Sequence, residues 1–214
     1  MNTPKVVTAY LSDFRLWVLV RALPKGGHET SWCKTHDSDG PAVFVSALDA
    51  EIYRLNLHNR GDKNWRRCPL EAIDLAQMAA NFGGRIVCQM VFGFSANLSG
   101  QLTLRDGNLR PLCVPLPFDL GSGPMRPVTF SFDQQVFDFM RAQWEIIDAS
   151  DYPGMLERTN DLDDATLTEQ ALQALSVAPT TGEWEQGGDW AIFSPTPMRW
   201  HFGPQEQRQL SNLH

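Results

Sequence analysis

Apolar residues recur at every second position near the start of the chain. This two-residue period runs from Phe14 to Ala22 and predicts a β-strand. Residues 24–41 contain proline, glycine, serine and aspartate without an apolar period, so this segment is predicted to be a loop. Residues 42–45, with the sequence AVFV, predict a short strand.

Four later segments carry apolar residues three and four positions apart, as on one face of an α-helix. The first, 46–58, opens with Ser46 and Asp49 at the spacing of a capping box. The second, 68–84, has a proline near its start and a glycine at its end, which are helix start and stop signals. The other two span 131–148 and 161–177.

Strand-like runs fill the middle and the end of the sequence. They span 85–96, 101–106, 109–116, 127–132 and 198–202. Asp106-Gly107 predicts a hairpin, and a second hairpin is predicted about Gly187-Gly188 within 183–193. Because strands and helices do not alternate strictly, we expect an α+β fold. Its mostly antiparallel sheet, with about four helices packed on it, would form a single compact domain over residues 1–214.

Length and composition indicate a globular protein. The chain has 214 residues, of which 43% are apolar and 20% are charged, enough for a sizeable core. No stretch approaches the roughly 20 apolar residues that cross a bilayer, and the N-terminus lacks the pattern of a signal peptide. The four cysteines include no CxxC pair, which favours a reducing compartment. We therefore expect a cytoplasmic protein without membrane contacts.

Charge is distributed unevenly along the chain. Residues 133–190 contain thirteen acids against Arg141 and Arg158, a net charge of −11. The remainder has twelve acids and sixteen bases, or +4, and the two parts sum to −7. An acidic surface repels nucleic acid and attracts basic proteins. No nucleic-acid partner is therefore predicted. The alternative hypothesis, that the chain binds nucleic acid, rests on the basic loop 60–67, whose Trp65 would stack on a base.

The segment 26–37 concentrates reactive side chains. His28, Cys33 and His36 would supply three zinc ligands, but a structural site needs four. Cys33 with His36 or His201 would make a nucleophile and its base, although no flanking motif supports that pairing. A polar loop is the favoured interpretation, in which Cys33 is the thiol that reacts first. Two other thiols, Cys88 and Cys113, lie in apolar runs and are expected in the core.

Other patterns do not match known sites. The acids from 161 to 164 lack the glycine and the final acid of a calcium loop. Asp163 and Asp164 instead suit the first turn of a helix, where the helix dipole stabilises negative charge. The glycine-rich segments do not have the spacing of a phosphate-binding loop. No metal, other cofactor or catalytic residue is predicted.

Taken together, these features favour a non-catalytic binding protein. Acids interleaved with aromatic residues suit an interface with a basic protein. A compact, acidic chain without motifs resembles in type the immunity proteins that neutralise bacterial toxins. The predicted partner-binding residues are Asp148, Asp151, Tyr152, Asp161, Asp163, Asp164, Trp184, Glu185 and Trp190. Trp184 and Trp190 are expected to be exposed anchors. The alternatives are a small hydrolase that uses Cys33 with a histidine, and an assembly or scaffold subunit.

Overall fold

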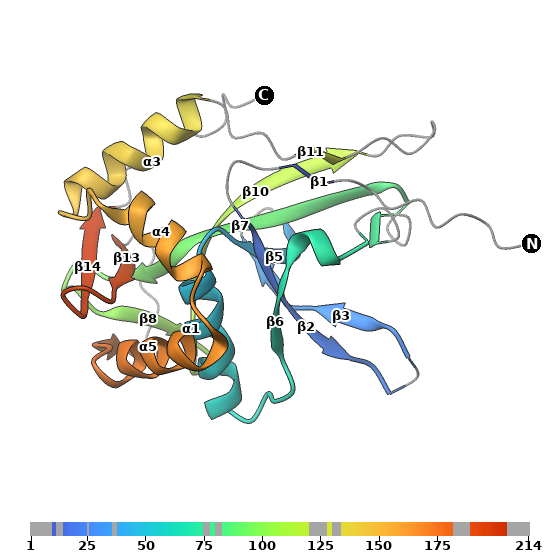
Figure 1. Cartoon of the computed structure of the whole chain (residues 1–214), viewed down its shortest axis with the longest axis horizontal. Helices are drawn as coiled ribbons and strands as arrows, with labels where there is room; N and C mark the ends of the chain where they lie inside the picture. Colours follow the sequence, from blue (N-terminus) through green and yellow to red (C-terminus); the bar gives the residue numbers. More distant parts are fainter. Residues whose placement is uncertain are drawn as a thin grey trace, which may run out of the picture.

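The chain folds around one long strand, β7 (Arg85–Ala96) (Figure 1). The computed structural model describes residues 10–11, 15–24, 26–35, 38–74, 78–79, 83–119, 128–129, 134–181 and 189–204. On one edge of β7 lies the antiparallel strand β10 (Pro111–Asp119). The other edge is shared by β5 (Asp39–Phe44), which is parallel to β7, and by β13 (Asp189–Ser194), which is antiparallel. The sheet is therefore mixed.

A glycine allows β13 to approach β7. Gly93 has a φ of +124°, which side-chain-bearing residues rarely adopt. A β-carbon at this position would lie 2.5 Å from the carbonyl oxygen of Ala191 on β13. The close approach matters because β13 and β14 (Arg199–Pro204) form the hairpin that supports the acidic helices described below.

The remaining strands extend this sheet or pair beside it. They are β1 (Tyr10–Leu11), β2 (Trp17–Ala22), β3 (His28–Thr30), β4 (Trp32–Lys34), β6 (Arg66–Pro69), β8 (Leu102–Arg105), β9 (Asn108–Leu109), β11 (Val128–Thr129) and β12 (Thr180–Thr181). The predicted hairpin at Asp106-Gly107 is confirmed, since Arg105 pairs with Asn108. Both turn residues have positive φ angles, of 52° and 78°, as a type I′ turn requires.

Four helices belong to the described part of the chain and complete an α+β fold. They are α1 (Ala47–Asn59), α3 (Gln134–Ile146), α4 (Tyr152–Asn160) and α5 (Asp164–Ser176). The predicted start of α1 is confirmed, because the Ser46 hydroxyl accepts the backbone N–H of Asp49 at 3.1 Å. No helix among the described residues is long and apolar enough to cross a membrane.

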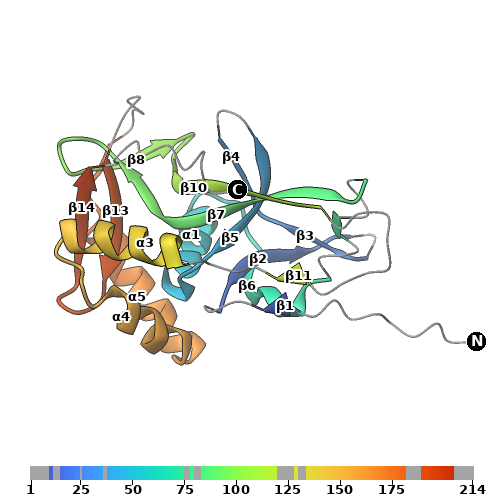
Figure 2. The same ribbon diagram turned by 90° about the horizontal axis from the view of Figure 1, so that it is seen from above.

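Apolar side chains pack on both faces of the sheet. One core lies between the sheet and the helices α1 and α5 and includes Phe44, Phe94 and Phe193. A second core joins α3 and α4 to β13 through Trp144, Tyr152 and other side chains. The helices α3, α4 and α5 gather with the β13–β14 hairpin on one side of the molecule, whereas β2 and β3 lie on the other (Figures 1 and 2).

Several predicted elements differ from the structure. The predicted loop 24–41 contains the strands β3 and β4 and the first half of β5, which form because their backbone groups pair with β2 and with each other. The predicted helix 68–84 begins instead with β6 and a 3-10 turn, Leu70–Ala72, after which Ile73 is extended, while Met78 and Ala79 within this range are helical. Helix α4 was not predicted. Residues 182–188, with the predicted Gly187-Gly188 turn, lie outside the described residues, and β13 pairs with β14 across a turn at 195–198.

Candidate protein-binding site

The helices α3 to α5 carry a set of exposed carboxylates. Within residues 140–181 these are Glu145, Asp148, Asp151, Glu157, Asp161, Asp163, Asp164 and Glu169. The same range has two bases, Arg141 and Arg158, so eight acids and two bases leave a net charge of −6. We call this set the acidic surface. Its position agrees with the unequal charge distribution in the sequence, since all three helices lie on one side of the molecule (Figure 2).

Some of these acids have structural roles. Asp148 pairs with Arg199 at 3.0 Å, Asp151 pairs with Arg158 at 2.7 Å, and Asp164 pairs with Arg67 at 2.6 Å. Asp163 caps helix α5, because its carboxylate accepts the Thr166 backbone N–H at 2.9 Å. The prediction that Asp163 and Asp164 serve the start of a helix is therefore confirmed, and reversing their charge would disturb folding as well as any binding.

Replacing Asp163 with alanine should lower the free energy of unfolding, because α5 loses its cap. Hydrogen bonds from Thr166 lower the pKa of Asp163, so this contribution is present at neutral pH and falls as the carboxylate is protonated in acid. Chemical denaturation at pH 7 measures the change. Asp161→Ala serves as the matched control, and an equal loss in both variants would contradict the capping role.

Other acids on this surface have no described partner. Among the described residues, Glu157, Asp161 and Glu169 make no side-chain hydrogen bond or ion pair. Glu157 and Asp161 are four positions apart at the end of α4, where like charges repel and the helix dipole disfavours an acid. These carboxylates therefore do not stabilise the helices, and they remain accessible to a cation from outside the chain.

Two of the predicted aromatic contacts are in the core. The exposed position expected for Trp190 is wrong, since its side chain is 4% exposed. The reason is that β13 is covered on both faces: Trp190 and Ile192 pack toward α3 and α4, while Phe193 belongs to the opposite core. Tyr152 is also buried, at 3% exposed, and packs against Trp144 with ring centroids 4.9 Å apart. Trp184 and Glu185 lie outside the described residues.

The hydroxyl of Tyr152 links α4 to a buried acid on α1. It donates to the Asp49 Oδ2 at 3.2 Å, while the Asp49 Oδ1 has no hydrogen-bond partner among the described residues. Burial raises the pKa of Asp49 to about 7, and the hydrogen bond from Tyr152 opposes that rise. The sequence placed Asp49 in a capping box but gave no indication that its carboxyl group would be buried.

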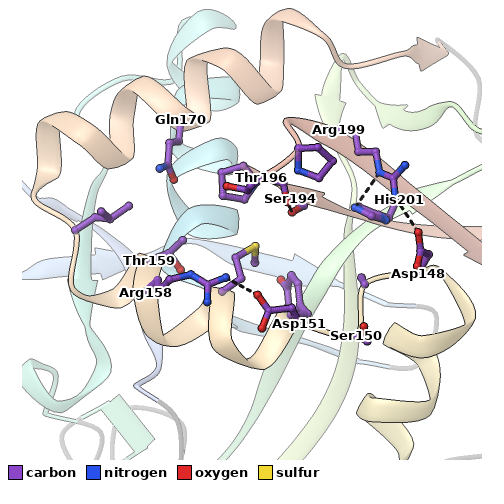
Figure 3. A pocket seen from close by; sticks show the side chains of 16 residues that line it. Asp148, Ser150, Asp151, Arg158, Thr159, Gln170, Ser194, Thr196, Arg199 and His201 are labelled. Atoms are coloured by element: carbon purple, nitrogen blue, oxygen red, sulfur yellow. Dashed lines mark hydrogen bonds and ion pairs between the residues drawn. The ribbon is translucent and has the colours of Figure 1, made fainter.

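A groove opens beside the acidic surface (Figure 3). Its volume is about 580 Å³, within the range of pockets that hold ligands. The walls come from the α3–α4 connection, from α4 and α5, and from the β13–β14 turn with the start of β14. Three of the predicted partner-binding residues, Asp148, Asp151 and Tyr152, line it. The groove was not predicted, because Gln170, Arg199 and His201 meet these residues only through the tertiary fold.

The polar groups of the groove are held by internal hydrogen bonds. His201 donates from Nδ1 to the Ile147 carbonyl at 2.9 Å, and its Nε2 accepts from the Arg199 Nε at 3.4 Å. Its ring is thereby fixed on both sides. The Arg199 guanidinium contacts Asp148 as well, so an aspartate, an arginine and a histidine form one connected wall (Figure 3).

The reactive segment near the N-terminus does not form a centre among the described residues. Cys33 lies on β4 with its side chain buried, whereas His28 is exposed on β3 and contacts Arg66 at 3.1 Å. His36 and Asp37 lie outside the described residues. Both ring nitrogens of His201 have partners other than Cys33, so the structure does not bring together the predicted Cys33–His201 pair.

The expected thiol order must also be corrected. Cys33 is 7% exposed, so it is not the most accessible thiol. We predict that Cys68 reacts first because it is partly exposed. Burial raises the pKa of its thiol, and Arg66 opposes that rise, whereas the pKa of the other partly exposed thiol, Cys113, is raised further by its hydrogen bond with Cys33 and by burial. Burial raises the pKa of Cys88 to about 12, and Cys88 should react last. Mass spectrometry after brief alkylation of the native protein gives the order, and early labelling of Cys88 would contradict this placement.

The basic segment 60–67 does not present its tryptophan for stacking. Trp65 is 9% exposed, and its ring nitrogen donates to Asp62 at 2.9 Å. Arg21 covers its ring, with the guanidinium carbon 4.4 Å from the centroid. Arg67 pairs with Asp164 of the acidic helices. The aromatic contact on which the nucleic-acid alternative depended is thus occupied within the protein.

Comparisons of the chain with protein-family models, with curated proteins and with solved structures give no match. Its function must therefore be inferred from the acidic surface and the groove.

Proposed function

We propose that this chain is a non-catalytic, cytoplasmic binding protein of the inhibitor or immunity type. In this proposal the acidic surface engages a basic protein, such as a bacterial toxin. The main support is the set of acids on α4 and α5 without a described partner, Glu157, Asp161 and Glu169. Repulsion between Glu157 and Asp161, four positions apart, costs stability in the free protein, and a basic partner would relieve it.

Charge and anchors have separate roles in this proposal. Long-range attraction between the acidic surface and a basic partner raises the association rate, while contacts buried at the interface set the dissociation rate. The buried positions of Tyr152 and Trp190 remove them as direct anchors. Exposed aliphatic side chains, such as Ile146 on α3 and Leu172 on α5, are about half exposed and are available for apolar contact. Trp184 stays a predicted anchor.

Affinity capture from cell extract tests the proposal. The bait is the full chain, compared with a variant that carries Glu157→Lys, Asp161→Lys and Glu169→Lys. We expect the wild-type bait to retain a basic protein that the variant loses. Purified partner alone and with the chain would then be assayed for its own activity, since an inhibitor lowers that activity whereas an assembly subunit does not. Retention of the same proteins by both baits would contradict the proposal.

A further inference from the structure

Two hydroxyl groups that line the groove direct their hydrogens into the protein. The Thr159 hydroxyl donates to the Leu156 carbonyl at 3.2 Å, and the Ser194 hydroxyl donates to the Thr196 carbonyl at 2.6 Å. A hydroxyl that donates inward keeps its oxygen lone pairs as acceptors. Neither hydroxyl therefore needs a further acceptor, and both can receive a hydrogen from a ligand.

The charged side chains of the groove are paired with one another. Arg158 directs an N–H group to Asp151, and Arg199 directs N–H groups to Asp148 and to His201. Each aspartate accepts through its Oδ2, so its second carboxylate oxygen adds acceptor capacity at the rim (Figure 3). The His201 Nδ1–H is taken by the Ile147 carbonyl. The two arginines and two aspartates balance in charge, so the attraction for a cation comes from the acidic surface around the groove.

One acceptor on the wall has no partner. The Gln170 Oε1 on α5 is buried and makes no hydrogen bond among the described residues. A buried polar atom without a partner destabilises the protein. A ligand that donates a hydrogen to this oxygen would recover that lost stability, so the wall at Gln170 selects for a donor.

We propose that the groove binds the guanidinium side chain of an arginine from the basic partner. A guanidinium offers five N–H donors in one plane and no acceptor, which suits a groove whose lining includes the acceptors of Gln170, Thr159, Ser194 and two aspartates. Its positive charge suits the surrounding acidic surface. The groove is larger than one side chain, so the arginine would enter at the tip of a protein loop. This inference rests on the proposed function and names the contact that would give the interface its specificity.

Small blocked amino acids test the groove without the partner. N-acetyl-arginine methylamide is titrated into the full chain and followed by amide chemical shifts in the NMR spectrum. We expect changes confined to residues 148–159, 170 and 194–201. The citrulline analogue has the same shape without charge and should bind more weakly, and the glutamate analogue should not bind. Equal binding of the arginine and citrulline analogues, or changes elsewhere only, would overturn the proposal.

Variants at Gln170 provide the sharper measurement. Gln170→Met keeps the volume and removes the acceptor, so arginine binding should weaken about fivefold. Gln170→Glu strengthens the acceptor and should tighten binding. Gln173→Met on the same helix lies outside the groove lining and should change nothing. If Gln170→Met and Gln173→Met behave alike while Gln170→Glu has no effect, the proposed contact is wrong.

Failure of this inference can be separated from failure of the proposed function. Capture of a basic protein by the acidic surface, combined with no effect of Gln170 variants on its affinity, would keep the function and reject the arginine site. Binding of the arginine analogue in the groove without any captured basic protein would keep the cation site and reject the function.

Discussion

Replacing Asp49 with asparagine should stabilise the folded protein by several kcal/mol above pH 7 and have little effect near pH 4. Asp49 is 1% exposed and has no cationic partner among the described residues. Burial raises its pKa to about 7 from an ordinary value of 3.8. The unfolded chain therefore loses this proton at lower pH than the folded chain, and the wild type loses stability as pH rises between these two values. The difference between the folded-state and unfolded-state pKa of Asp49 corresponds to about 4 kcal/mol of stability at most. Asparagine does not ionise and therefore avoids this loss of stability.

Denaturant unfolding of the wild type and the Asp49→Asn variant at several pH values between 4 and 8 measures this effect. The difference in unfolding free energy should grow with pH up to about pH 7 and then level off. Tyr152→Phe, made in the chain that keeps Asp49, removes the hydrogen bond that favours the charged carboxylate and should extend the loss of stability to higher pH. A difference between the wild type and the Asp49→Asn variant that does not vary with pH would show that Asp49 titrates normally.

Reversing the charges of Glu157, Asp161 and Glu169 should slow association with the basic partner by about tenfold or more at low salt. Dissociation should change less, since most of this effect is long-range attraction. The difference should shrink in about 1 M salt, where charges are screened beyond roughly 3 Å. These three acids suit the test because, among the described residues, none of their side chains caps a helix or forms an ion pair, unlike those of Asp163 and Asp164.

Binding kinetics at low and high ionic strength provide the measurement. A neutral triple variant, with Gln, Asn and Gln at these positions, should have an intermediate association rate. Equal association rates for the wild type and the lysine variant at low salt would mean that these acids do not face the partner.

Local sequence patterns predicted those elements whose signals are contained within a few residues. Ser46 marks the start of α1, and Asp106-Gly107 marks a two-residue hairpin, because each depends on backbone groups two or three positions away. Helix α4 was missed because Pro153 and Gly154 lie in its first turn. Those residues usually signal turns, yet packing of Tyr152 and Met155 against α3 and β13 holds the helix in place.

The candidate site was predicted only in part. The charge distribution along the sequence predicted an acidic surface on the helices α3 to α5, because acidic side chains are mostly exposed in folded proteins. The burial of the aromatic residues was less predictable. Trp190 follows Asp189 at the edge of a polar segment, but side chains pack on both faces of β13 and bury it. The groove depends on Gln170, Arg199 and His201 from separate elements, a combination for which the sequence has no local pattern.

The most direct test of the central claim compares two charge-reversed variants against one captured partner. One carries Glu157→Lys, Asp161→Lys and Glu169→Lys on the acidic surface. The other carries Arg60→Glu and Lys63→Glu, exposed bases in the loop between α1 and β6. Affinity at low salt should fall strongly for the first variant and stay near or above the wild-type value for the second. Retained affinity in the first with lost affinity in the second would show that the basic loop, and not the acidic surface, binds the partner.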